Sequence, residues 1–373
     1  MKVALVHDYI KEFGGAERVL ETLHEMFPNA DVYTSVYLPN FLGPHKDRFK
    51  NWKIYTSFFQ YIPFKAKLIS LARFVAPLMF YQFNLKKYDL VITSTTGTYT
   101  SPNFLRVGDK TLHLCYCHTP PRYLYGYAVA NDWTDSWFRR ILLILGQIPM
   151  HFLRILDFKF AQRPDYFISN SNEVGLRINK FYRREATTIY PPVELKHVVK
   201  VERKEDFYLA GGRLSRAKRI DLAIYACKEL NRKLKVFGKG FGNIKDELSK
   251  IASSKIEFVG EVNDGEKMKL YAQAKGYILP ADNEDFGIVA LESMASGTPV
   301  IAYRSGGLKE SIIENKTGIF FDELSKKAVV NAIKKFEQLS FDQKDCIAQA
   351  KKFSKERFKK EMLQFINAKL KKK

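Results

Sequence analysis

Two glutamates lie eight residues apart in the segment EDFGIVALESMASGTPV, residues 284–300. The first, Glu284, follows the strand-like run GYILP, so we expect it in the loop at the carboxyl end of that strand. A carboxylate in such a loop can accept two hydrogen bonds from a vicinal diol, as in a sugar. The spacing therefore predicts a polar binding group immediately before a short helix.

The helix after this loop is expected to begin near Phe286, with Asp285 as its N-cap. The N–H groups of Phe286, Gly287 and Ile288 would then be first-turn donors, and the helix dipole would add partial positive charge. Such a helix start binds anions, and Gly287 allows a ligand to approach the backbone closely. The segment predicts an anion site next to the first glutamate.

The second glutamate, Glu292, lies about two turns into the same helix, among mostly apolar neighbours. Burying a carboxylate without a partner is costly. The sequence leaves two partners open, a ribose diol or an ion pair with a nearby lysine or arginine. Gly297, followed by Pro299, predicts the end of the helix.

A basic cluster follows another strand-like run, in AGGRLSRAKRIDLAI, residues 210–224. Gly212 closes the glycine pair that opens the turn, and Arg213 and Lys218 precede a helix expected near Arg219. A guanidinium and an ammonium at a glycine-rich strand end suit a pyrophosphate. A solvated basic loop is the alternative.

The first half of the chain holds two weaker candidates. Gly14 and Gly15 lie between the first strand-like run and the first long helical pattern, where backbone N–H groups can bind an anion. His118 ends another strand-like run before Thr-Pro-Pro, which places it at a strand's carboxyl end, although a lone histidine can be structural. The adjacent CYCH run lacks a second Cys/His pair at zinc spacing, so we expect no metal site there.

Alternating strands and helices are predicted to position all of these residues. The strand-like runs are 3–7, 88–94, 111–118, 165–171 and 187–193 in the first half, and 207–212, 233–238, 256–260, 276–280, 299–303 and 317–321 in the second. Helical patterns separate them, which predicts an α/β protein with parallel sheets and right-handed crossovers. Ligands then bind beyond the carboxyl ends of the strands.

Length and composition fit two globular domains, with 373 residues and 46% hydrophobic content. Pro191-Pro192 and the charged run after it predict the linker. The net charge of +21 favours anionic partners. Only four cysteines are present, so a reducing cytoplasmic compartment fits.

Two amphipathic basic stretches stand out, residues 58–83 and 133–160. Both mix lysine or arginine with large apolar side chains, and neither contains an apolar run long enough to span a bilayer. They are either helices packed on the sheet or a membrane-facing surface that docks on anionic lipid. The sequence leaves both interpretations open.

With these residues in place, the chain resembles the retaining glycosyltransferases of family 4 (GT4), which belong to the glycosyl transferases group 1 and have the GT-B fold. The resemblance rests on Glu284 and Glu292 in their E-x7-E pattern and on GGRLSRAK. The segments GGAERVL and CHTPPRYLY resemble the mannosyltransferase-like members that build bacterial surface polysaccharides.

This resemblance implies two Rossmann-like domains whose parallel sheets face each other across a cleft. Residues 1–195 would form the acceptor-binding domain, together with a C-terminal helix, 353–373, that crosses back to it. Residues 196–352 would bind a nucleotide-sugar donor. GDP-mannose is favoured and UDP-sugars remain open, while the acceptor would be a glycan or a lipid-linked intermediate.

Residue roles are also implied by the resemblance alone. Arg213 and Lys218, beside Gly212, would contact the diphosphate, and Glu292 would bind the ribose. Glu284 and the backbone at 286–288 would hold the transferred sugar. The turn of Gly14 and Gly15 would approach that sugar from the other domain, and His118 would lie near the reacting sugar. No cofactor and no essential metal are expected.

Two other functions stay open. A GT-B nucleotide-sugar epimerase would use the same donor site without an acceptor. A basic nucleic-acid-binding protein would explain the charge, but the chain contains no nucleic-acid-binding motif, so we expect no nucleic-acid partner.

Overall fold

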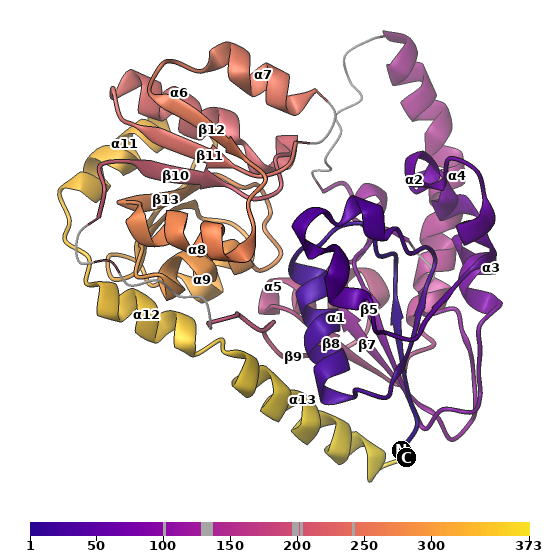
Figure 1. Cartoon of the computed structure of the whole chain (residues 1–373). Coiled ribbons are helices and arrows are strands. Elements are labelled where there is room, and N and C mark those ends of the chain that lie inside the picture. Colours follow the sequence, from indigo (N-terminus) through magenta and orange to yellow (C-terminus); the bar gives the residue numbers. More distant parts are fainter. Residues whose placement is uncertain (100–101, 128–136, 196–200, 202–203, 241–242) are drawn as a thin grey trace. The chain divides into compact units, whose positions relative to one another are not determined.

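The structure is a computed structural model that describes residues 1–99, 102–127, 137–195, 201, 204–240 and 243–373, with side chains of 137–146 outside the description. The chain divides into two compact units (Figure 1). The first comprises Met1–Tyr127, the described part of Trp133–Pro192, and Lys355–Lys373, and the second comprises Val193–Ser354.

The first unit contains a parallel seven-stranded sheet in the order β3-β2-β1-β5-β7-β8-β9. The strands are β1 (Val3–His7), β2 (Asp31–Thr34), β3 (Ile54–Thr56), β5 (Leu90–Thr95), β7 (Leu112–Cys117), β8 (Tyr166–Ser169) and β9 (Ala186–Thr188), with a separate pair, β4 (Asn84–Leu85) and β6 (Arg106–Val107). Its helices are α1 (Gly15–Met26), α2 (Lys65–Leu68), α3 (Ala76–Tyr81), α4 (Trp137–Ala161), α5 (Asn172–Tyr182) and α13 (Lys355–Leu370).

Side chains alternate across this sheet and separate two apolar layers. Val3 and Leu5 of β1 pack with residues of α1 and α13 on one face. Ala4 and Val6 pack with the segment that includes α3 on the other face. The neighbouring strands β7 and β8 direct Cys115, Cys117 and Phe167 towards α4 and α5. The sheet is therefore covered on both sides, as parallel sheets require.

The last helix, α13, belongs to the first unit although it is the end of the chain. Its buried side chains Phe358, Met362 and Ile366 lie in the same apolar layer as β1. Lys355 extends this contact through a 3.0 Å ion pair with Glu25 of α1.

The second unit contains a parallel six-stranded sheet in the order β12-β11-β10-β13-β14-β15. Its strands are β10 (Tyr208–Gly211), β11 (Leu234–Phe237), β12 (Ile256–Gly260), β13 (Gly276–Leu279), β14 (Val300–Tyr303) and β15 (Gly318–Phe321). Its helices are α6 (Ile220–Glu229), α7 (Ile244–Ile251), α8 (Asp264–Gln273), α9 (Ile288–Ala295), α10 (Leu308–Ser311), α11 (Lys326–Glu337) and α12 (Gln343–Lys351). The predicted α/β class with parallel sheets is confirmed.

Both sheets reverse their strand order at one point. In the first unit, β2 and β3 extend the sheet from one side of β1, and the strands after β5 extend it in the opposite direction, so the order reverses between β1 and β5. In the second unit, the order reverses between β10 and β13 in the same way. The loops leaving such strands diverge and open a crevice at the carboxyl edge. Ligand-binding residues are therefore expected after these four strands.

One expectation about the strands needs correction, and the two amphipathic stretches differ in how regular their helices are. The strand expected over 187–193 is shorter, since β9 ends at Thr188, and the short strands β2 and β3 were not foreseen. The stretch 58–83 forms short helical turns, of which α2 and α3 are the α-helical ones, rather than continuous helices. Of 133–160, residues 133–136 lie outside the described part, and α4 continues to Ala161 with Pro149 inside it. No described helix combines the length and the apolarity needed to cross a bilayer.

Candidate functional site

The loop between β13 and α9 carries the first glutamate, and its helix starts later than expected. The expectation that Asp285 caps a helix starting near Phe286 is wrong, because α9 begins at Ile288 with Gly287 as its N-cap. Gly287 has φ +85°, and a Cβ there would lie 2.4 Å from Leu308 Cδ2. This left-handed glycine redirects the chain before the helix. Gly297 does follow the C-cap, with φ +72°, as predicted.

Glu284 is held in place by a glycine pair in the next loop, after β14. Gly307 N donates a hydrogen bond of 2.9 Å to Glu284 O. A Cβ on Gly306 would lie 1.9 Å from the same oxygen, and one on Gly307 would lie 2.5 Å from Asp285 O. Only glycine permits this approach, so Gly306 and Gly307 position the predicted site residue from a distant part of the sequence.

The structure brings Lys218 and Glu284 together, since Lys218 Nζ donates to Glu284 Oε2 in an ion pair. Both side chains are only partly exposed. A second link joins their loops, because Asp282 N donates to Ala217 O at 2.9 Å. These loops leave β10 and β13, so the predicted cation and carboxylate meet at the strand reversal of the second sheet.

The turn after β10 is tightly packed beside this ion pair. A Cβ on Gly238 would lie 1.8 Å from Gly212 O, and one on Gly212 would lie 3.7 Å from Val289 Cγ1 of α9. The turn is therefore next to the start of α9. Arg213 follows Gly212 at the same carboxyl edge and is exposed. The structure thus gathers Gly212, Lys218, Glu284 and the α9 start, with Arg213 at their edge.

Glu292 is buried on α9, and the alternative of an ion pair is what the structure contains. Lys267 Nζ of α8 donates to Glu292 Oε1 at 2.8 Å and lies 3.3 Å from Asp264 Oδ1. Beneath the site, burial and then the charges of Glu284 and Glu292 raise the pKa of Tyr277. The Tyr277 phenol therefore stays protonated and donates to Gly211 O at 2.8 Å.

In the first unit, Gly14 is the N-cap of α1 and Gly15 is its first residue. Gly14 N donates to Glu17 Oε2 at 2.8 Å, which is half of a capping box. The other carboxylate oxygen, Glu17 Oε1, lies 3.5 Å from Nε2 of His7, the last residue of β1. The glycine turn is therefore joined to the carboxyl end of β1.

His118 comes directly after β7 and is largely buried. Its Nε2 lies 3.0 Å from Ser94 Oγ on β5, and Ser94 Oγ lies 3.1 Å from His7 Nδ1 on β1. Sequence reasoning missed His7, Ser94 and Glu17. Position in the fold is the signal that could have found them. His7 is the last residue of β1, Ser94 is the last but one of the neighbouring β5, and Glu17 lies in the first turn of α1.

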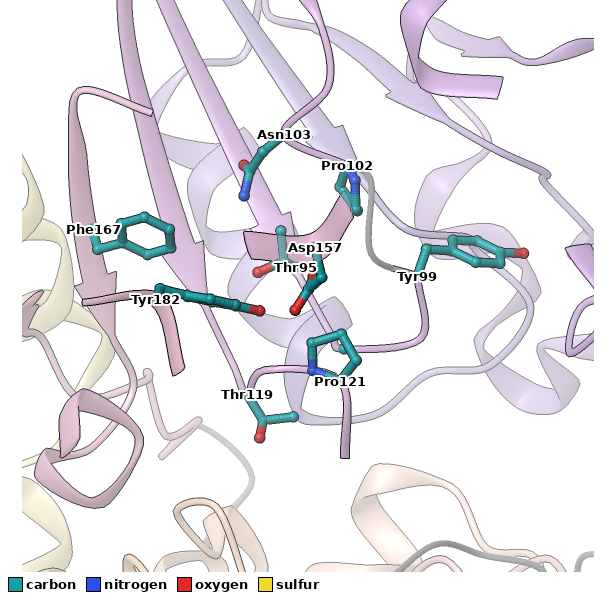
Figure 2. A pocket seen from close by; sticks show the side chains of 10 residues that line it. Thr95, Tyr99, Pro102, Asn103, Thr119, Pro121, Asp157, Phe167 and Tyr182 are labelled. Carbon is teal, nitrogen blue, oxygen red and sulfur yellow. The ribbon is translucent and has the colours of Figure 1, made fainter. Parts of the chain in front are cut away.

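A small polar cavity lies beside this part of the first unit (Figure 2). Its volume of about 10 Å³ accommodates about one water, too little for a sugar. Burial raises the pKa of Asp157, which lines it, to about 7, and Tyr125 Oη donates to this carboxyl at 2.7 Å. A larger hollow of about 340 Å³ lies at the amino ends of β10–β12, away from the residues gathered above.

The described residues contain no group of three or more His, Cys, Asp or Glu arranged to hold a metal ion. Cys115 and Cys117 are buried as free thiols, and so are the other two cysteines. The residues gathered at the second sheet are instead lysines, an arginine, carboxylates and backbone N–H groups, which suit an anionic ligand with hydroxyls.

Residues 194–353 match the family described as Glycosyl transferases group 1. This part of the chain, which holds the Lys218–Glu284 pair, is therefore a glycosyltransferase domain. The match covers less than half of the chain and coincides closely with the second unit.

Among curated proteins, one uncharacterized glycosyltransferase of Methanocaldococcus jannaschii is 35% identical over 137 residues, 34% of this chain and 35% of that protein. A second one from the same organism is 30% identical over 169 residues, 44% of this chain and 48% of that protein. The alignments thus span a third to a half of these relatives.

Solved structures match over the whole chain. Sucrose-phosphate synthase from Thermosynechococcus elongatus has a TM-score of 0.75 at 18% identity and covers 100% of both chains. HepE of Anabaena in complex with UDP has a TM-score of 0.70 at 16% identity, over 99% of this chain and 100% of that one. These neighbours are GT-B glycosyltransferases, and at such low identity they show the fold.

Proposed function

We propose that the chain is a retaining family 4 glycosyltransferase that moves a hexose from a nucleotide-diphosphate sugar to a glycan or lipid-linked acceptor in cell-surface polysaccharide synthesis. The observation that carries the proposal is the Lys218–Glu284 ion pair at the strand reversal of the second sheet. The pair supports the proposal because an ammonium suits a phosphate and a carboxylate suits sugar hydroxyls, and both lie inside the segment that matches glycosyl transferases group 1.

In this proposal, the donor diphosphate replaces Glu284 as the partner of Lys218. Arg213, at the same edge, adds a second cation, and the turn at Gly212 and the N-terminus of α9 add N–H dipoles. Glu284, released from Lys218, accepts hydrogen bonds from hydroxyls of the transferred sugar. Glu292 is already paired with Lys267. It can therefore bind the ribose only if a ribose hydroxyl shares the carboxylate with Lys267.

The proposed reaction breaks the anomeric C–O bond, and negative charge builds up on the departing diphosphate. Fixed cations and N–H dipoles stabilise that charge, which is the main catalytic contribution we assign to the second unit. The same groups can neutralise the diphosphate, so we propose that no metal and no cofactor is required. His118 and Gly15 of the first unit are proposed to act on the transferred sugar.

GDP-mannose is the favoured donor, because GGAERVL and CHTPPRYLY resemble segments of the mannosyltransferase-like members. UDP-sugars are the alternative donors, and the structures of HepE with UDP and with UDP-glucose support this alternative. A thermal-shift screen of GDP-, UDP- and ADP-sugars separates them. A donor at 100 times its Kd should stabilise the fold by roughly 2.7 kcal/mol.

Replacing Lys218 tests the proposed donor site. Lys218→Ala should lower turnover about 10²- to 10³-fold, as expected for removing one preorganised charge. Arg216→Ala is the matched control, since Arg216 lies in the same turn but forms an exposed ion pair with Glu247. Equal activity of Lys218→Ala and wild type with every candidate donor would refute the assignment. Donor conversion without any acceptor would instead favour the epimerase.

We also propose that the first unit docks on the cytoplasmic face of an anionic membrane. The apolar surface, defined as the exposed large side chains of 58–81 and α4, includes Phe64 and Leu71, which are 79% and 63% exposed. Phe104 stacks on both Tyr81 of α3 and Phe160 of α4, which places these helices side by side (Figure 1). Such a large exposed apolar area is unusual for a protein surrounded by water.

The positive charge of the segment that carries the apolar surface favours an anionic partner. Residues 58–83 contain lysines and an arginine but no aspartate or glutamate. Basic residues beside exposed apolar side chains fit anionic lipid headgroups above an acyl layer. A lipid-linked acceptor would be presented at the same membrane.

Vesicle sedimentation tests this docking. Phe64→Ser with Leu71→Ser should lower binding to vesicles of phosphatidylcholine and phosphatidylglycerol at least tenfold, because each loses buried apolar area. The control is Leu176→Ser on α5, outside the apolar surface and 69% exposed. Unchanged binding of the double variant, or equal wild-type binding to pure phosphatidylcholine, would contradict the proposal.

A further inference from the structure

Four polar side chains in the first unit form a chain of contacts that ends at His118. It runs from Glu17 Oε1 to His7 Nε2 at 3.5 Å, from His7 Nδ1 to Ser94 Oγ at 3.1 Å, and from Ser94 Oγ to His118 Nε2 at 3.0 Å. All four side chains are buried. The contacts cross three adjacent strands, β1, β5 and β7, at the strand reversal of the first sheet.

Proton positions along this chain follow from the donors and acceptors available. A carboxylate such as that of Glu17 only accepts, so the facing nitrogen, His7 Nε2, carries a proton. In a neutral imidazole the other nitrogen, His7 Nδ1, is then an acceptor and takes the single hydroxyl proton of Ser94. Ser94 has no second proton, so it accepts from His118 Nε2–H.

We infer that Glu17, His7 and Ser94 are positioning residues that hold His118 as the Nε2–H tautomer. The inference rests on the proposed function for its catalytic meaning only, since the tautomer can be read without any reaction. It also ties the Gly14 turn to His118, because Glu17 binds both Gly14 N and His7.

One substitution should reverse every hydrogen bond in the chain of contacts. In Glu17→Gln, the amide oxygen keeps Gly14 N as its donor, and the amide N–H₂ faces His7 Nε2. His7 must then accept at Nε2 and donate from Nδ1 to Ser94, which in turn donates to His118 Nε2. His118 is left with its proton on Nδ1, which is the opposite tautomer.

The test is a ¹H–¹⁵N NMR correlation of ¹⁵N-histidine-labelled full-length protein, with His118 assigned from a His118→Gln sample. Wild type should show the Nε2–H pattern and Glu17→Gln the Nδ1–H pattern, with the kcat of Glu17→Gln reduced about 10- to 100-fold. Ser94→Ala should give a mixture of tautomers. Its control is Ser169→Ala, a buried serine of β8 that contacts Thr188.

Two outcomes would overturn the inference, namely an Nδ1–H pattern in wild type, or an Nε2–H pattern that persists in Glu17→Gln. An altered tautomer with unchanged kcat would overturn the positioning role. A wild-type protein inactive with every donor but with the expected tautomers would instead refute the proposed function and leave the hydrogen-bond assignment standing.

Discussion

Two carboxylates of the first unit and two of the second have opposite kinds of partner. In the first, Asp157 and Asp8 are surrounded by phenol, hydroxyl and backbone donors, and burial raises the pKa of each carboxyl. Neither forms an ion pair with a lysine or arginine in the described part of the chain. In the second unit, Glu284 and Glu292 each contact a lysine.

This difference matches different chemical tasks. In the proposed function, a lysine that already pairs with a carboxylate is held in place for an incoming diphosphate. Hydrogen-bonded groups such as His7, Ser94 and His118 can instead fix a tautomer. In the proposed function, the anionic part of a donor therefore belongs with the second unit and neutral hydroxyl chemistry with the first.

The largest expected effect concerns the buried ion pair of the second unit. Lys267→Met leaves Glu292 buried without its cation and should lower the free energy of unfolding by about 3–5 kcal/mol. Hydrogen exchange of the β13 and β14 amides measures this within the unit. Lys316→Met, which breaks an exposed pair with Asp345, should cost less than about 1 kcal/mol. Equal losses would contradict the role assigned to the buried pair of Lys267 and Glu292.

The glycine that positions Glu284 gives the next largest effect. Gly306→Ala should destabilise the second unit by about 2–4 kcal/mol, combining a left-handed backbone with a clash against Glu284 O. Gly260→Ala has a comparable backbone, φ +89°, but no atom within 4 Å of the added Cβ. The control should therefore show only the backbone cost in denaturant unfolding. Equal denaturation midpoints for the two variants would contradict the role of Gly306 in positioning Glu284.

A pH titration tests the carboxyl of the first unit. The pKa of Asp157 is raised from 3.8 to about 7. The stability that this carboxyl contributes is therefore fully present below about pH 4 and is lost as the pH rises through 7. Raising the pH from 5 to 7 should destabilise the first unit by on the order of 2 kcal/mol. Asp157→Asn should remove this slope, measured by hydrogen exchange of β7 amides. An unchanged slope would show that another group causes it.

Much of the fold was predictable because buried parallel strands are continuous apolar runs. The runs now seen as β1, β5 and β7 were recognisable in this way, and so was Gly297 at the end of α9. The short strands β2 and β3 were not, since three or four residues carry little periodicity. For residues 58–83, helices packed on the sheet were one of two interpretations, but apolar and basic content does not show where helical turns break.

The site was predictable in its residue types but not in its pairing. Glu284, Lys218 and His118 all follow strands, which local sequence reveals. Their partners depend on contacts between distant segments, since Lys218 and Glu284 are 66 residues apart and Ser94 and His118 are 24 apart. The start of α9 was misplaced because the left-handed backbone of Gly287 comes between Asp285 and the helix.

The most direct test of the proposed donor site is the affinity of the protein for GDP and UDP, measured by calorimetry. If Glu284 competes with the diphosphate for Lys218, Glu284→Gln should tighten nucleoside diphosphate binding roughly fivefold, about 1 kcal/mol. In a Lys218→Ala background, the same substitution should change the affinity less than about twofold, because no cation remains to be released. Unchanged or weaker binding by Glu284→Gln with Lys218 present would contradict the exchange of partners at the second sheet.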